Sequence, residues 1–143
     1  MRLYHYSTWA GQRIYEEGFI AASVAYERFT GSSLMGCTPL IFLTTNDHWE
    51  PSVQARSKRQ FWEKCGSCPE VYTELGIPCW KFRVEDGIGV RAVDYSTTRS
   101  WRRMLGDAII LGSDPEQWYI CGGYVNVIEP WKWEKGQWTT PTN

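Results

Sequence analysis

His5 and Ser7 are the first residues of this chain that are suited to chemistry, because they follow Leu3 in a short run of aliphatic and aromatic residues. The run from Leu3 to Tyr6 predicts a β-strand. A histidine that projects from a buried first strand stands at the end of that strand, where it can meet a ligand. A lone histidine on an apolar strand is also a common core residue, so both interpretations of His5 stay open.

Glu50 is the second candidate, and it also follows a predicted strand. Residues 39–45 form a short apolar run that is typical of a strand buried on both faces, and its polar end, Thr44 and Thr45, can face a cleft. Residues 49–62 predict a helix. A carboxylate at a helix start that follows a strand end commonly lines a cleft, although it also serves simply as a partner of the helix dipole.

Three further elements are predicted up to residue 85: a short helix, a loop and a strand. Thr8 fits the N-cap of a short helix that Gly18 ends. Residues 63–78 are rich in glycine and proline and predict a loop. Residues 79–85 alternate strictly between apolar and charged side chains, which predicts a half-exposed strand.

The C-terminal part of the chain adds one helix and two strands. Residues 96–111 predict a helix that Ser96 or Thr97 caps. Residues 118–121 and 124–133 predict strands, and the second is followed by a turn at Lys135-Gly136. Strands therefore outnumber helices. We expect a compact α+β domain, residues 1–143, with a curved, mostly antiparallel sheet and two or three helices.

Length and charge narrow the class of protein. A chain of 143 residues suits one domain and is short for two. The net charge of -1 gives no overall attraction for nucleic acid, although Arg99, Arg102 and Arg103 would gather positive charge on one side of a helix, as a solvated surface or for an acidic partner. No hydrophobic run approaches the roughly 20 residues that span a bilayer, and the N-terminus lacks a signal peptide. We expect a cytoplasmic protein with no membrane partner.

The five cysteines form an odd set, which predicts free thiols in a reducing compartment. Cys65 and Cys68 have the spacing of a zinc knuckle, and Cys79 follows them. A further cysteine or His48 could complete a tetrahedral zinc site. No second paired motif follows, so we expect no metal.

Six short stretches of the chain resemble an uncharacterised family of bacterial and phage proteins. That family is in turn similar to small NAD-using ADP-ribosyltransferases, which include the RNA 2'-phosphotransferase and the toxin that ADP-ribosylates DNA. The shared opening of such proteins is an aromatic residue, histidine, any residue and threonine or serine, followed by a helix and a glycine-aromatic-isoleucine step. The stretches that carry the resemblance are residues 3–7, 14–20, 41–45, 49–52, 113–119 and 133–138.

The resemblance implies a split, bent sheet that holds NAD, as the substrate, in a central cleft. By matching position, His5 would hydrogen-bond a hydroxyl of the nicotinamide ribose, and Ser7 would help to fix the adenosine side. Thr44 and Thr45 would lie at the cleft end of the second strand. Arg56 could reach a phosphate, or could belong to a solvated helix face. The nicotinamide ring would stack on one aromatic side chain: Tyr6, Phe42 or Trp49.

The catalytic carboxylate is where the sequence departs from the family pattern. Known members carry an acidic residue on a late strand, but this chain has Gly122 and Gly123 at the corresponding place. Glu50 and Glu129 are the remaining candidates, and we prefer Glu50. The carboxylate would stabilise the positive charge that develops as nicotinamide leaves and would orient a nucleophile.

The resemblance implies an NAD-dependent ADP-ribosyltransferase of phage or mobile-element origin that modifies a protein or a nucleic acid, and we expect His5 and Glu50 to be its catalytic residues. A second hypothesis is a binding module that captures NAD or an NAD-derived nucleotide signal without turnover, as the Gly122-Gly123 pair suggests. A third is an inhibitor that acts by protein contact through exposed members of its nine tryptophans.

Overall fold

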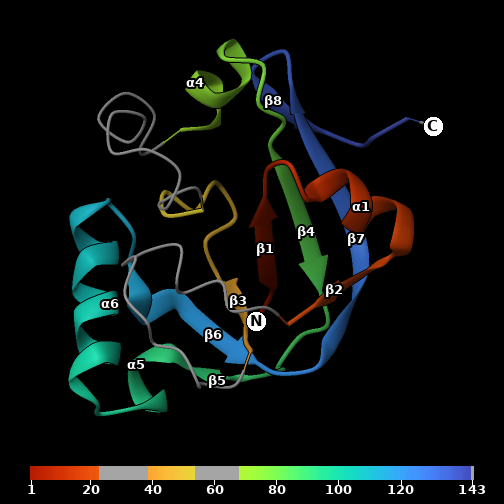
Figure 1. Ribbon diagram of the computed structural model, residues 1–143. Helices are drawn as coiled ribbons and strands as arrows, with labels where there is room; N and C mark the ends of the chain where they lie inside the picture. Colours follow the sequence, from red (N-terminus) through yellow and green to blue (C-terminus); the bar gives the residue numbers. More distant parts are fainter. Residues whose placement is uncertain (23–38, 54–67, 143) are drawn as a thin grey trace.

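The computed structural model in Figure 1 describes residues 1–22, 39–53 and 68–142. Its central feature is an eight-stranded sheet with the order β2-β7-β4-β1-β3-β6-β5, in which β8 pairs with β7. Every pairing among these strands is antiparallel, which confirms the predicted α+β class. The strands are β1 (Leu3–Ser7), β2 (Phe19–Ala21), β3 (Ile41–Thr44), β4 (Trp80–Val84), β5 (Val90–Arg91), β6 (Trp118–Cys121), β7 (Tyr124–Glu134) and β8 (Gln137–Thr139).

β1 and β3 join the two halves of this sheet through a single register pair, Tyr4 with Thr44. By contrast, β1 forms five register pairs with β4, and β3 forms four with β6. One half contains β2, β7, β4 and β1, and the other contains β3, β6 and β5. The strand order is continuous, but the pairing between β1 and β3 is short, and we call this short pairing the narrow joint.

The described residues contain four α-helices, where the sequence predicts two or three. α5 and α6 lie beside β6, and α1 lies beside the other half of the sheet (Figure 1). α4 lies inside the stretch predicted as a loop, because a proline in the first helical turn costs no hydrogen bond that the helix needs. The helices are α1 (Gly11–Glu17), α4 (Pro69–Glu74), α5 (Ala92–Tyr95) and α6 (Arg99–Ile110).

The helix ends agree with the prediction at one terminus and differ at two. Gly18 ends α1 in the left-handed region at a φ of 79°, as predicted. α1 begins after Ala10 rather than after Thr8. α6 is capped by Thr98, whose hydroxyl oxygen accepts the N–H of Trp101 at 3.3 Å, rather than by Ser96 or Thr97.

The predicted helix over residues 49–62 is wrong at its start. Residues 51–53 form a turn, in which the N–H of Val53 donates to the carbonyl of Glu50 at 3.2 Å. The Glu50 side chain accepts the N–H of Ser52, so this carboxylate closes a local turn. The rest of the predicted helix, including Arg56, lies outside the described residues.

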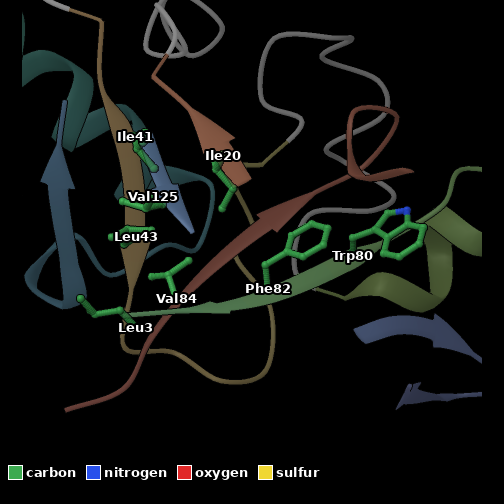
Figure 2. Packing of buried hydrophobic residues seen from close by; sticks show 8 residues of the cluster. All are labelled: Leu3, Ile20, Ile41, Leu43, Trp80, Phe82, Val84 and Val125. Atoms are coloured by element: carbon green, nitrogen blue, oxygen red, sulfur yellow. The ribbon is translucent and has the colours of Figure 1, made fainter. Parts of the chain in front are cut away.

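Side chains cover both faces of the sheet. One face carries the cluster in Figure 2: Leu3, Ile20, Ile41, Leu43, Trp80, Phe82, Val84 and Val125. On the opposite face, the half with β3 and β6 packs against α5 and α6 through Leu40, Ala92, Trp101, Met104, Ala108, Trp118 and Ile120. The half with β1 and β4 is covered by what we term the aromatic cluster, with Cys79 among its rings: Tyr4, Tyr6, Trp49, Tyr72 and Trp133.

The predicted half-exposed strand is therefore buried on both faces. Trp80, Phe82 and Val84 of β4 lie in the cluster of Figure 2, as their alternation indicates. Lys81 points the other way but is only 8% exposed. Aromatic rings from β1, β7 and β8 surround its ammonium group, and the pattern of charge in the sequence does not reveal such a cover.

The close approach of α1 to β4 depends on Gly11. A Cβ atom at this position would overlap the indole ring of Trp80, which is fully buried. We expect Gly11→Ala to lower the free energy of unfolding by about 1–3 kcal/mol, as overpacking of a core does. Urea denaturation monitored by tryptophan fluorescence measures this change.

Gly106→Ala is the matched control for this substitution. A Cβ atom at Gly106, inside α6, would meet no atom within 4 Å. Alanine should then stabilise the helix by about 0.5–1 kcal/mol. If Gly11→Ala were as harmless as Gly106→Ala, the packing of α1 on Trp80 would not depend on the glycine.

Candidate functional site

A pocket of about 850 Å³ lies where the two halves of the sheet meet. β1 and β3 supply its inner wall, α1 and β2 supply a second wall, and residues 50–53 with Trp118 close a third side. Its volume lies within the range of about 300–1,000 Å³ that is typical of small-molecule sites. The pocket therefore lies at the narrow joint between β1 and β3, and the sequence predicts a site at the ends of these two strands.

His5 lies in the wall of this pocket and bridges the joint. Its Nδ1 atom is 2.9 Å from the carbonyl oxygen of Phe42 in β3. A carbonyl oxygen only accepts, so Nδ1 carries the proton, and in the neutral ring Nε2 is then the acceptor nitrogen. Such a nitrogen can accept a hydrogen bond from a ligand hydroxyl.

Glu50 lines the same pocket and is half-buried. Its Oε1 atom accepts the backbone N–H of Ser52 at 3.2 Å, the Ser52 hydroxyl at 2.7 Å and the Ser113 hydroxyl. Its Oε2 atom accepts the indole N–H of Trp118 at 2.8 Å. Hydrogen bonds to a carboxylate are stronger than neutral ones, so this group is held firmly, and none of these donors carries a charge that would neutralise it.

The segment that leads to Glu50 is clamped by three side chains from the sheet. The carbonyls of residues 46, 47 and 48 accept, in that order, the Tyr6 hydroxyl at 2.6 Å, the Lys81 ammonium at 3.0 Å and the Trp138 indole N–H at 2.9 Å. Three successive carbonyls are thereby fixed against β1, β4 and β8. The clamp determines where the chain turns and hence where Glu50 enters the pocket.

Lys81 is an unusual member of this clamp, because it places a cation among aromatic rings. Its Nζ atom lies 4.5 Å from the ring centre of Trp131, 5.2 Å from that of Trp138 and 5.4 Å from that of Tyr4. Burial lowers the pKa of Lys81, and the charges of Asp47 and Glu129 partly oppose that shift. Cation–π attraction to the three rings supports the charged form.

Two of the predicted aromatic stacking residues are part of the core. Tyr6 packs against Trp49 and Trp138 with ring centres 5.4 and 6.0 Å apart. Burial, with the nearby charge of Asp47, raises the pKa of the Tyr6 phenol, so Tyr6 remains a protonated donor. Tyr6 is among the residues that line the pocket, whereas Trp49 is 1% exposed and is not among them. Phe42 lines the pocket and stacks on Trp101 of α6.

Of the three predicted hydroxyl residues, two line the pocket and one does not. Ser7 and Thr44 are buried and line the pocket. Thr44 Oγ1 accepts the N–H of Asn46 at 3.1 Å, so this hydroxyl helps to shape the turn after β3. Thr45 pairs through its N–H with the carbonyl of Gln117 and is not among the pocket residues that the structure describes.

Of the two candidate carboxylates, only Glu50 is at the pocket. Glu129 is exposed on β7, opposite Arg83 of β4. Gly122 and Gly123 form the turn between β6 and β7, where Gly123 has a φ of 71°. This turn offers no carboxylate to the pocket.

The sequence did not single out Ser52, Ser113 or Trp118 as parts of the site. Ser113 and Trp118 follow α6 and lie more than sixty positions after Glu50, so no spacing rule relates them to it. Trp9 and Arg13 were also missed; both line the pocket from the α1 side. Trp9 is 65% exposed and is the one largely exposed tryptophan in the described part of the chain.

The zinc hypothesis finds no support in the described ranges. No group of three or more histidine, cysteine or acidic side chains there could hold a metal ion. Cys68 and Cys121 are free thiols, Cys79 is buried, and Cys65 lies outside the described residues.

Comparison with known proteins found no matching family model, no matching curated protein and no matching solved structure.

None of the helices in the described segments combines the length and the apolar character needed to cross a membrane.

The contribution of the hydrogen bond from Trp118 to Glu50 to the free energy of unfolding can be measured by comparing Trp118 with Trp101. Both tryptophans are buried, and the Trp101 indole donates instead to the backbone carbonyl of Ala92 at 2.8 Å. Trp118→Phe and Trp101→Phe remove similar volumes. The difference between their losses in the free energy of unfolding therefore measures the effect of the charged acceptor, Glu50. We expect Trp118→Phe to lower the free energy of unfolding by about 1 kcal/mol more than Trp101→Phe does. Equal losses in urea denaturation would contradict a charge-assisted bond.

Proposed function

We propose that this chain binds NAD in the pocket and transfers its ADP-ribose moiety to an acceptor, with release of nicotinamide. The observation that supports this proposal is that His5 and Glu50, far apart in the sequence, line one pocket between β1 and β3. The sequence resemblance to ADP-ribosyltransferases assigns an NAD-related role to His5, and Glu50 is the candidate carboxylate that lies at the same pocket. The pocket is also large enough for a ligand of this size class.

The chemistry follows from the two side chains. With Nδ1 committed to Phe42, His5 can accept a hydroxyl of the nicotinamide ribose at Nε2 and orient that sugar. As the bond between the ribose and nicotinamide breaks, positive charge develops at the ribose C1 atom. The carboxylate of Glu50, held by hydroxyl and N–H donors, stabilises this charge without first having to reorganise.

A second function is favoured by the same hydrogen bonds. Four donors converge on Glu50, so this carboxylate also connects the turn at residues 50–53 to Ser113 and to Trp118. A carboxylate with this structural role alone would leave a pocket that binds NAD, or a nucleotide derived from it, without turnover. Binding and nicotinamide release must therefore be measured separately.

The NAD site is tested by calorimetry with the purified chain. We expect NAD to bind, and His5→Asn to weaken binding at least tenfold, which is about 1.4 kcal/mol. Asparagine can reproduce the donor at Nδ1 but has no acceptor in place of Nε2. His48→Asn is the matched control, because His48 is exposed and does not line the pocket. Unchanged affinity in His5→Asn would remove His5 from the site, and an absence of binding by the unmodified chain would overturn the proposal.

Catalysis is tested by following free nicotinamide with mass spectrometry. We expect Glu50→Gln to retain NAD binding and to slow nicotinamide release by about 100-fold or more, because the stabilising charge is lost. A thermal melt of the same variant verifies its fold. Binding of NAD without any release by the unmodified chain would support the non-catalytic module instead.

A further inference from the structure

Ser52 carries a hydroxyl nucleophile at the pocket in which the proposed chemistry takes place. It lines the pocket, although its side chain is only 2% exposed. Its hydroxyl donates to Oε1 of Glu50 at 2.7 Å, and its oxygen lies 3.0 Å from the hydroxyl oxygen of Ser113. A serine that is hydrogen-bonded to a carboxylate has the arrangement of a nucleophile with its general base.

We propose that Ser52 is an internal acceptor, to which the protein transfers ADP-ribose from NAD bound in its own pocket. This inference rests on the proposed function. The bond between nicotinamide nitrogen and C1 of its ribose breaks, and nicotinamide leaves with the bonding electron pair. Ser52 Oγ forms a new bond to C1, and its proton passes to the Glu50 carboxylate. No oxidant, reductant or other reactant is needed.

Three other hydroxyls near the pocket lack one of these features in the described contacts. Ser113 also bonds to Glu50, but it is not among the residues that line the pocket. Ser7 and Thr44 line the pocket, yet none of the contacts described for the chain joins either hydroxyl to a carboxylate. Ser52 combines access to the pocket with a hydrogen bond to a carboxylate.

The modification would end the activity of the molecule that carries it. ADP-ribose on Ser52 would fill the pocket and remove the hydrogen bond that Ser52 donates to Glu50. Because the Ser52 hydroxyl is reached through the pocket of its own chain, the reaction is intramolecular. Its rate constant should then not depend on protein concentration.

The test incubates the purified full chain with NAD and follows its intact mass and the release of nicotinamide. We expect a mass increase of one ADP-ribose, located at Ser52 by peptide fragmentation. The rate constant should stay unchanged after tenfold dilution. The adduct should survive neutral hydroxylamine, which cleaves an ester on Glu50 but not an acetal-type bond on a serine oxygen, so this result does not depend on any variant.

Ser52→Ala should abolish the adduct, whereas Ser96→Ala, in the half-buried link between α5 and α6 and not among the pocket residues, should retain it. Nicotinamide release with an unmodified chain, or an adduct at another residue, would overturn the assignment of Ser52 and leave the proposed function intact. An absence of nicotinamide release would overturn both the assignment of Ser52 and the proposed function, so the failure of each claim gives a different result.

Discussion

The narrow joint between β1 and β3 is the constraint on which the site depends. Only Tyr4 and Thr44 pair across it in register, and the His5 ring adds a bond to Phe42 beyond that pair. A full ladder would bring the two strands together along their length, at the usual spacing of about 4.8 Å. Because the ladder is short, the halves of the sheet part, and the pocket opens with His5 in its wall.

The aromatic residues explain how residues 50–53, on the third side of the pocket, are placed. Tyr6 and Trp138 use their polar atoms to hold backbone carbonyls, while their rings fill the core. Lys81 completes the clamp from among the rings. A buried cation is costly when it is unpaired, and here a carbonyl and three aromatic faces compensate it. The abundance of aromatic residues thus serves packing and positioning together.

Glu50 combines a structural and a chemical position. It bonds to Ser52 in its own turn and to Ser113 and Trp118 from distant parts of the chain. Such bonds make the carboxylate rigid, and rigid charge is what stabilises a developing cation effectively. The same bonds would serve a purely structural brace. The distinction between an enzyme and a capture module therefore depends on this one side chain.

Local patterns determined much of the fold. The apolar runs at β1, β3 and β6, the alternation in β4, and the glycine that ends α1 each act within a few residues, so their elements could be predicted from the sequence. The sequence placed His5 in one predicted strand and Glu50 after another, and both residues line the pocket. Only the tertiary structure decided that Lys81 is buried, that Trp49 is core and that Ser113 and Trp118 hold Glu50, because these contacts join residues far apart in the sequence and depend on which strands lie side by side.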